Sequence, residues 1–301
     1  MITVLATLFS YSQTKEIIYA DANDSNSNYY IAFKPEKQAE GLLLLLTSFG
    51  ERPEIAMNET SIQNTASAKG LITVFASLQM GTANFFIDSA SQVTLDHLIP
   101  MLQQKYHTQN KPFYLGAFSL GGAGVVKYAE RAYASPMLIK PKAIFAIDPP
   151  LDFERVYYSL KETMRQSKTE VALREADYFL KRIEFEFQGT PYYQLKSFHK
   201  LSPYSYSDTL HTNIKPLVNC PVMLLSEPDL IWQMEERGRS INDLNIMDCS
   251  SMINSLKLMG NKKALLVISS GKGYRKLTGK RNPHSWSIAE SEAVINWLIG
   301  Q

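Results

Sequence analysis

Several features that would point to a particular class of protein are scarce in this chain of 301 residues. It has two cysteines, Cys220 and Cys249, and they fit no metal-ligand spacing. We therefore predict no metal site and interpret both as small buried apolar residues, since a disulfide would require an oxidising compartment. No other segment after the N-terminus contains the roughly 18 unbroken apolar residues that a membrane span needs, so no span is predicted.

An excess of charge of one sign is lacking as well, because 31 Lys and Arg oppose 29 Asp and Glu, for a net charge of +2. This balance gives no indication of a nucleic-acid partner, and the aromatic residues form no basic-aromatic stripe. No Pro/Gly/Ser-rich linker, internal repeat or glycine-rich phosphate loop is present, and we predict no cofactor. The 45% hydrophobic content suffices for one large core. No prediction of oligomeric state follows.

Residues 1–13 are apolar and end in small and polar residues. They resemble the back half of a secretory signal peptide without its basic front, and the alternative is an ordinary first strand. The first interpretation predicts a periplasmic or secreted protein, and the second a cytoplasmic one.

The rest of the chain alternates between short apolar runs and segments with helical spacing. The alternation predicts an α/β fold with a mostly parallel sheet and helices on both faces. The run of five leucines at 42–46 is typical of a strand buried on both faces. Strands are expected at 16–19, 29–33, 42–46, 71–78, 112–116, 143–147, 221–225 and 264–268, and helices at 53–69, 93–106, 122–129, 250–258 and 285–298.

Residues 151–216 interrupt this alternation with polar helical segments, expected at 153–166 and 169–182, and with many aromatic residues. Because the insertion follows one strand end and precedes the next, we interpret it as a helical cap above the active edge of the sheet. The predicted core domain is then 14–150 together with 217–301.

The most informative motif is Ala117-Phe118-Ser119-Leu120-Gly121, between a predicted strand and a predicted helix. A serine at such a junction lies on a sharp turn that exposes its hydroxyl, and the residues two before and two after it must be small. Ala117 and Gly121 meet this requirement. Ser119 is therefore the candidate nucleophile.

A serine nucleophile needs a base, and the base needs an orienting carboxylate. His284 is the candidate base because it lies between the last predicted strand and the last helix. His97, His107, His199 and His211 lie in helices or in the cap and are weaker candidates.

Asp229 is the preferred carboxylate because it follows the penultimate strand and gives the chain order Ser, Asp, His. Asp148 at the end of the preceding strand is its rival, although Asp148-Pro149-Pro150 also suits a plain turn. Glu227 is a further alternative.

An acyl transfer needs two N–H donors for the developing oxyanion. One is expected at Leu120, directly after the nucleophile, and the other in the loop after the leucine strand, at Ser48, Phe49 or Gly50. We choose Phe49 from these three.

The chain resembles the α/β-hydrolase superfamily over about residues 15–299. The resemblance is carried by the motif at Ser119, by Glu227-Pro228-Asp229 and by Pro283-His284-Ser285-Trp286. The resemblance implies Ser119 as nucleophile, His284 as general base and acid, and Asp229 as orienting carboxylate. Alanine replaces the first motif glycine, and Thr47-Ser48-Phe49-Gly50 replaces the His-Gly type of oxyanion loop.

These residues predict a serine hydrolase that cleaves a small-molecule carboxylic ester through an acyl-enzyme. A peptidase or amidase with the same triad and a non-catalytic binding protein of the same fold are the alternatives. The pattern predicts no particular substrate-binding residues. A basic run precedes His284, in which Arg275 or Arg281 would bind an anionic substrate group if the run is not simply a solvated loop.

Overall fold

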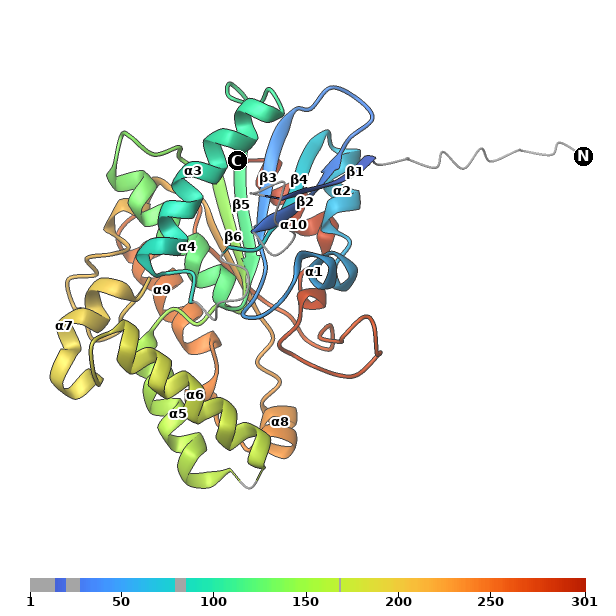
Figure 1. Cartoon of the computed structure of the whole chain (residues 1–301). Coiled ribbons are helices and arrows are strands. Elements are labelled where there is room, and N and C mark those ends of the chain that lie inside the picture. The colour runs from blue at the N-terminus through green and yellow to red at the C-terminus, as the bar shows by residue number, and fades with distance from the viewer. Residues whose placement is uncertain (1–13, 20–27, 79–84, 168) are drawn as a thin grey trace, which may run out of the picture.

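The computed structural model describes residues 14–19, 28–78, 85–167 and 169–301 (Figure 1). The predicted signal segment, 1–13, lies outside these residues. The described part is built around an eight-stranded sheet of order β1-β2-β4-β3-β5-β6-β7-β8. The strands are β1 (Thr14–Tyr19), β2 (Tyr29–Lys34), β3 (Gly41–Leu46), β4 (Leu71–Ala76), β5 (Phe113–Phe118), β6 (Ala143–Ile147), β7 (Val222–Ser226) and β8 (Leu265–Ile268).

The strand directions confirm the predicted mostly parallel sheet. β1 pairs with β2, and β2 with β4, in antiparallel register, whereas the pairs from β4 through β3, β5, β6 and β7 to β8 are parallel. The carboxyl ends of the parallel strands therefore lie at one edge, where ligands bind in open α/β sheets.

Two layers of helices cover the sheet, and the leucine strand β3 shows how they are separated. Leu42, Leu44 and Leu46 pack in one apolar cluster, while Leu43 and Leu45 pack in the other. This alternation follows from the two-residue period of a strand. The first cluster contains α3 (Ser89–Lys105), α4 (Leu120–Ala134) and α9 (Ile246–Leu258), and the second contains α1 (Pro53–Glu59), α2 (Ile62–Ala68) and α10 (Ser291–Ile299).

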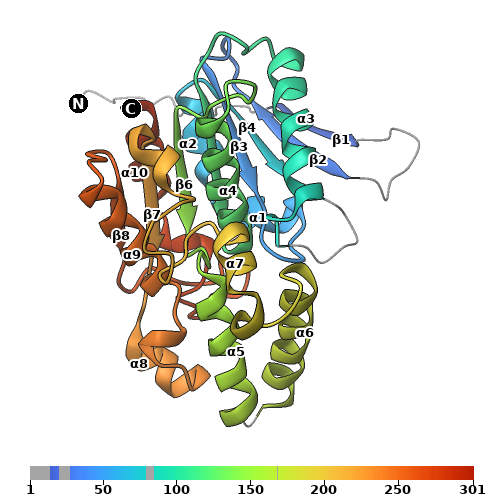
Figure 2. The same ribbon diagram turned by 90° about the vertical axis from the view of Figure 1, so that its left-hand side faces the viewer.

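The insertion predicted as a cap contains three helices, α5 (Phe153–Gln166), α6 (Glu170–Glu186) and α7 (Pro191–Leu201). Figures 1 and 2 both show α5 and α6 side by side beyond one end of the sheet, with α8 (Leu230–Trp232) next to them. A π-turn, η2 (Gln233–Arg237), and a 3-10 turn, η3 (Ile241–Asp243), follow α8. We call residues 230–245 the α8 segment.

Several element predictions were wrong in detail. The helix expected at 53–69 is interrupted at Thr60, whose Oγ1 accepts the Ile62 N–H at 3.3 Å and ends the first helix. The last helix begins at Ser291, because Trp286–Ile288 form a 3-10 turn that buries the indole. Neither α7 nor the α8 segment was predicted.

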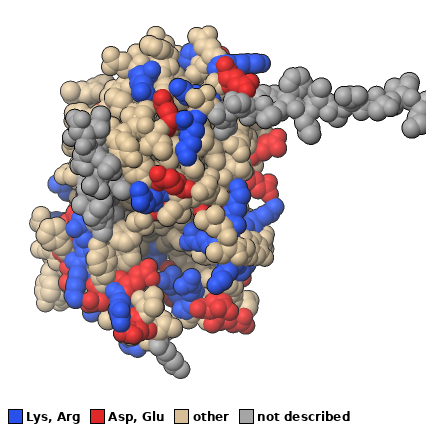
Figure 3. All heavy atoms as spheres, turned by 45° about the vertical axis from the view of Figure 1, so that its right-hand side comes forward, with Lys and Arg blue, Asp and Glu red and all other residues tan. Residues whose placement is uncertain are grey.

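Figure 3 shows that basic and acidic side chains are interspersed on the face in view, as the small net charge suggests. Within the residues the structure describes, no helix is long and apolar enough to cross a membrane. Cys220 and Cys249 are both buried free thiols, as predicted.

The contact between the start of α4 and the end of β3 generates a stability prediction. A Cβ atom on Gly121 would lie 2.2 Å from the Thr47 carbonyl oxygen, which is backbone and has little room to move. We expect Gly121→Ala to lower the free energy of unfolding by about 1–3 kcal/mol or more, measured by urea denaturation. Gly300→Ala is the control, because its Cβ would meet nothing closer than 3.2 Å. Equal stabilities of the two variants would contradict the prediction.

A buried carboxyl in α4 generates a second prediction. Burial raises the pKa of Glu130 to about 8, although Lys127 Nζ lies 3.3 Å from its carboxylate. Because the folded pKa lies above the ordinary value near 4.5, this group contributes stability below pH 4.5 and loses it as the pH rises through about 8.

The free energy of unfolding of the wild type, relative to Glu130→Gln, should therefore fall as the pH rises from 5 to 8. The limiting slope for one proton is about 1.4 kcal/mol per pH unit. Urea denaturation of both proteins across this range measures it, and other ionisations cancel in the difference. A difference that is independent of pH would show that Glu130 ionises normally.

Candidate active site

Ser119 occupies the tight turn that joins β5 to α4. Its φ of 54° and ψ of −127° are unusual for a residue other than glycine, and such strain of about 1–3 kcal/mol persists only where the surroundings enforce it. The Ser119 N–H donates to the Ile147 carbonyl at 2.8 Å, which ties the turn to the neighbouring strand. Only glycine fits at Gly121, where α4 approaches the end of β3. The backbone thus fixes the position of the serine hydroxyl at the carboxyl edge.

The structure brings His284 to this hydroxyl, as the sequence predicted. His284 Nε2 lies 2.9 Å from Ser119 Oγ. The imidazole packs against the Phe118 ring, with 4.6 Å between ring centroids, and the His284 N–H donates to Asn282 Oδ1 at 3.1 Å. A side chain held on both its ring and its backbone can accept a proton from Ser119 without a large reorganisation.

Asp148, and not Asp229, lies at the other imidazole nitrogen. Its Oδ2 is 2.6 Å from His284 Nδ1, and its Oδ1 accepts a hydrogen bond from Ser226 Oγ at 2.5 Å. The Asp148 N–H donates to the Leu225 carbonyl at 2.6 Å, which stabilises a positive φ of 47° at the end of β6.

Asp229, the predicted carboxylate, has other partners. It accepts hydrogen bonds from the Arg281 guanidinium and, at 3.4 Å, from the Trp232 N–H. Two features account for this placement. β6, which Asp148 follows, is the immediate neighbour of β5 and its serine, whereas β7, which Asp229 follows, lies one strand further away, by about 4.8 Å, and Arg281 engages Asp229 there. The structure thus does not bring Asp229, the residue chosen from chain order, to the imidazole, and its rival, Asp148, lies there.

Glu227, the third carboxylate considered, supports the loop that leads to His284. Its buried side chain accepts the N–H groups of Lys272 and Gly273 at 2.9 and 3.1 Å and pairs with Arg281. Arg281 also donates to the Gly273 carbonyl at 2.6 Å. Arg281 is thus occupied within the protein, contrary to the interpretation that it would bind substrate.

Two other residues of the basic run, Lys272 and Arg275, have contacts within the protein. Lys272 pairs with Glu290 at 2.5 Å. The guanidinium of Arg275, the other residue considered for an anionic substrate, lies 5.9 Å from the centre of the Phe118 ring. Lys272, Lys276 and Lys280 are exposed, whereas Arg275 and Arg281 are half-buried, so most of the run is a solvated loop.

The remaining histidines lie away from Ser119. His199 Nε2 is 2.8 Å from Ser207 Oγ, and His211 stacks on Tyr204. His97 belongs to α3, and His107 follows that helix with a positive φ of 53°.

Candidate donors for an oxyanion lie at the start of α4 and in the loop after β3. Leu120 is the first residue of α4, and the N–H groups in the first turn of a helix have no partner within that helix. In the loop after β3, the Ser48 N–H already donates to Glu51 Oε2 at 2.9 Å. Because the Ser48 N–H is already used, Phe49 and Gly50 remain as candidates for the second oxyanion donor. The Phe49 ring packs on Phe179 of α6, with 4.8 Å between centroids.

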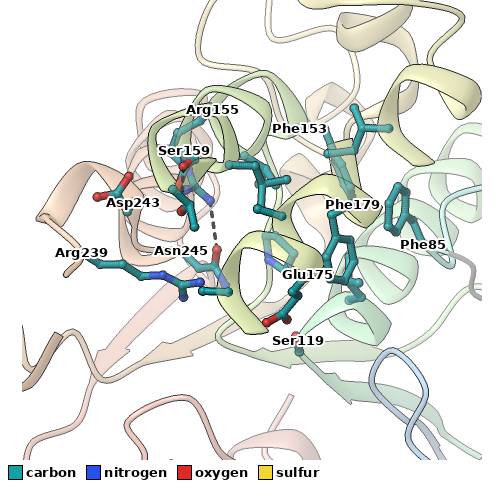
Figure 4. Close-up of a pocket in the computed structure, with 18 residues that line it drawn as sticks. Phe85, Ser119, Phe153, Arg155, Ser159, Glu175, Phe179, Arg239, Asp243 and Asn245 are labelled. Carbon is teal, nitrogen blue, oxygen red and sulfur yellow. Dashed lines mark hydrogen bonds between the residues drawn. The ribbon is translucent and has the colours of Figure 1, made fainter. Parts of the chain in front are cut away.

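A pocket opens beside Ser119 between α5, α6 and the α8 segment, with a cavity volume of about 170 Å³ (Figure 4). Sequence analysis predicted no residues for it. Its walls come from segments that are far apart in the chain, so no local motif indicated them. Besides Ser119 and Leu120, the residues that line it include Phe85, Phe153, Arg155, Glu175, Phe179, Ile183, Arg239, Asp243 and Asn245.

No family model matches the chain, and no curated protein matches it in sequence. Many solved structures resemble it in three dimensions. Carboxyl esterase 2 from the fungus Tuber melanosporum is 14% identical with a TM-score of 0.57, and the match covers 97% of this chain and 86% of the esterase. An S-formylglutathione hydrolase from Agrobacterium tumefaciens is 11% identical with a TM-score of 0.58 and 99% of each chain covered.

An acylaminoacyl peptidase from Pyrococcus horikoshii is 13% identical with a TM-score of 0.57, covering 94% of this chain but 39% of the peptidase. Identities this low establish the fold and not the reaction. The sheet order, the serine turn after β5 and these similarities agree: the chain has the α/β-hydrolase fold.

Proposed function

We propose that the protein is a serine hydrolase that cleaves a carboxylic ester through an acyl-enzyme, with Ser119, His284 and Asp148 as its triad. The observation that supports this most directly is the position of the His284 imidazole, 2.9 Å from Ser119 Oγ on one side and 2.6 Å from Asp148 Oδ2 on the other. A hydroxyl, a base and an orienting carboxylate in this order are the groups that acyl transfer needs.

In the proposed mechanism Ser119 Oγ attacks the ester carbonyl while His284 Nε2 takes the hydroxyl proton. Asp148 accepts the Nδ1–H and stabilises the imidazolium that forms. The Leu120 and Phe49 N–H groups are the proposed donors to the oxyanion. His284 then protonates the departing alcohol, and in the second half-reaction it activates the water that releases the acid from Ser119.

The first test is covalent labelling with a fluorophosphonate together with turnover of p-nitrophenyl esters. The wild type should be labelled and should release a burst of p-nitrophenol, and Ser119→Ala should abolish both because the attacking oxygen is gone. A folded wild type that is not labelled and hydrolyses no ester or amide would favour the alternative, a non-catalytic binding protein.

Matched ester and anilide substrates separate an esterase from an amidase or peptidase. Amide cleavage also depends on protonation of the leaving amine by His284, so both reactions fit the same residues. Faster hydrolysis of the ester supports the proposal, and comparable kcat/KM for the anilide would support the amidase alternative.

The two aspartates provide a second, independent test of the triad. Asp148→Asn should lower kcat by about 1,000-fold or more, because an amide cannot hold the productive tautomer of His284. Asp229→Asn is the matched control on the next strand end, and we expect a far smaller loss because it contacts Arg281 and not the imidazole. If the Asp229 variant lost more kcat than the Asp148 variant, the assignment would be reversed.

A further inference from the structure

The pocket beside Ser119 has two chemically different sides. Figure 4 shows the rings of Phe85, Phe153 and Phe179 on one side and Arg239 and Asp243 on the other. An apolar wall with a few polar groups on one side is typical of small-molecule sites in which the polar groups fix the orientation of the ligand. Polar groups on the charged side are therefore the ones that would orient a ligand.

Two of the charged groups on this side already have partners within the protein. Arg155 pairs with Asp248 and donates to Asn245 Oδ1 at 2.9 Å. Asp243 Oδ2 accepts the N–H and the hydroxyl of Ser240 at 2.8 and 2.9 Å. Arg155 therefore needs no further anion, and Asp243 keeps a negative charge that would not attract one.

Arg239 differs from both of them. Its side chain forms no hydrogen bond or ion pair with any described residue, so no described carboxylate lies within 4.0 Å of its guanidinium. The residue as a whole is exposed, and burial of part of its side chain lowers the pKa of the guanidinium, whereas the nearby charges of Glu175 and Asp243 act to raise it. A guanidinium with no hydrogen-bonded or ion-paired carboxylate can still bind one in a two-pronged geometry.

The pocket is also small, although it is open to solvent. Its volume of about 170 Å³ is below the range of roughly 300–1,000 Å³ that is usual for drug-sized ligands. Ser119 and Arg239 line the same small cavity, so a compact molecule could reach both.

We propose that Arg239 binds a second, ionised carboxyl group of the substrate, so that the preferred substrates are short esters that carry a free carboxylate. This inference rests on the proposed ester hydrolysis and specifies its substrate class. Glu175 of α6 lines the same pocket and its charge acts on the Arg239 guanidinium, so it competes with such a group.

The experiment compares kcat/KM for mono-p-nitrophenyl glutarate with that for p-nitrophenyl 5-methylhexanoate, in which an isopropyl group replaces the carboxylate. A second pair, 4-butyryloxybenzoate and its methyl ester, places the charge on the leaving group. The wild type should prefer the charged member of at least one pair. In Arg239→Gln that preference should fall by roughly 10- to 100-fold, the equivalent of one charge-assisted hydrogen bond.

Arg237→Gln is the matched control. It removes the same charge from the same segment, but Arg237 packs on the Trp232 ring and does not line the pocket. We expect its preference to stay within about twofold of the wild type, whereas Glu175→Gln should increase the preference for the charged substrate. If neither pair shows a preference in the wild type, or if the Arg237 and Arg239 variants behave alike, the inference is wrong.

A binding measurement distinguishes failure of this inference from failure of the proposed function. Glutarate itself should bind the wild type in calorimetry, and Arg239→Gln should weaken that binding by about 10-fold or more. Binding of this kind without any ester hydrolysis would reject the esterase proposal and retain the carboxylate site. Hydrolysis of esters with neither glutarate binding nor a charge preference would reject the carboxylate site and retain the esterase proposal.

Discussion

The close approach of α4 to the end of β3 is the constraint on which the rest of the site depends. Gly121 lets the helix begin against the Thr47 carbonyl, and the turn before it is held by the hydrogen bond from the Ser119 N–H to Ile147. Because the strands on either side are fully buried, this strained turn cannot relax without disturbing the core. Ser119 is therefore positioned by packing and not by its own side-chain contacts.

The loop that carries His284 has a different kind of support. Glu227 and Arg281 form a buried ionic contact with each other and with the backbone at Lys272 and Gly273. A buried carboxylate is tolerated only where its charge is paired and its oxygens are hydrogen-bonded, and both conditions hold here. Asp229 joins the same network, so the carboxylates at two neighbouring strand ends have different roles. Asp148 faces the imidazole, while Glu227 and Asp229 hold the loop.

The pocket is assembled from segments that have no relation in sequence. α5 and α6 supply the apolar wall, and the α8 segment contributes Arg239 from the opposite side (Figure 4). The sequence-based interpretation placed an anion-binding arginine in the basic run before His284. The structure pairs Arg281 internally and leaves Arg239 without a hydrogen bond or ion pair to its side chain among the described residues. Whether an arginine is available depends on the carboxylates around it, and a sequence does not show which carboxylates those are.

The sequence by itself determined the alternation of strands and helices, the burial of the leucine strand on both faces, and the serine turn with its small neighbours. These features are local, since periodicity and the size of residues two positions away are enough to predict them. It also determined that His284 follows the last strand. Only the tertiary structure decided which aspartate meets the imidazole, because Asp148 and Asp229 both follow strands, and the side chains that they contact, His284 and Arg281, come from a distant part of the chain. The pocket was likewise decided by packing, since its lining residues come together only when α5, α6 and the α8 segment meet at one edge of the sheet.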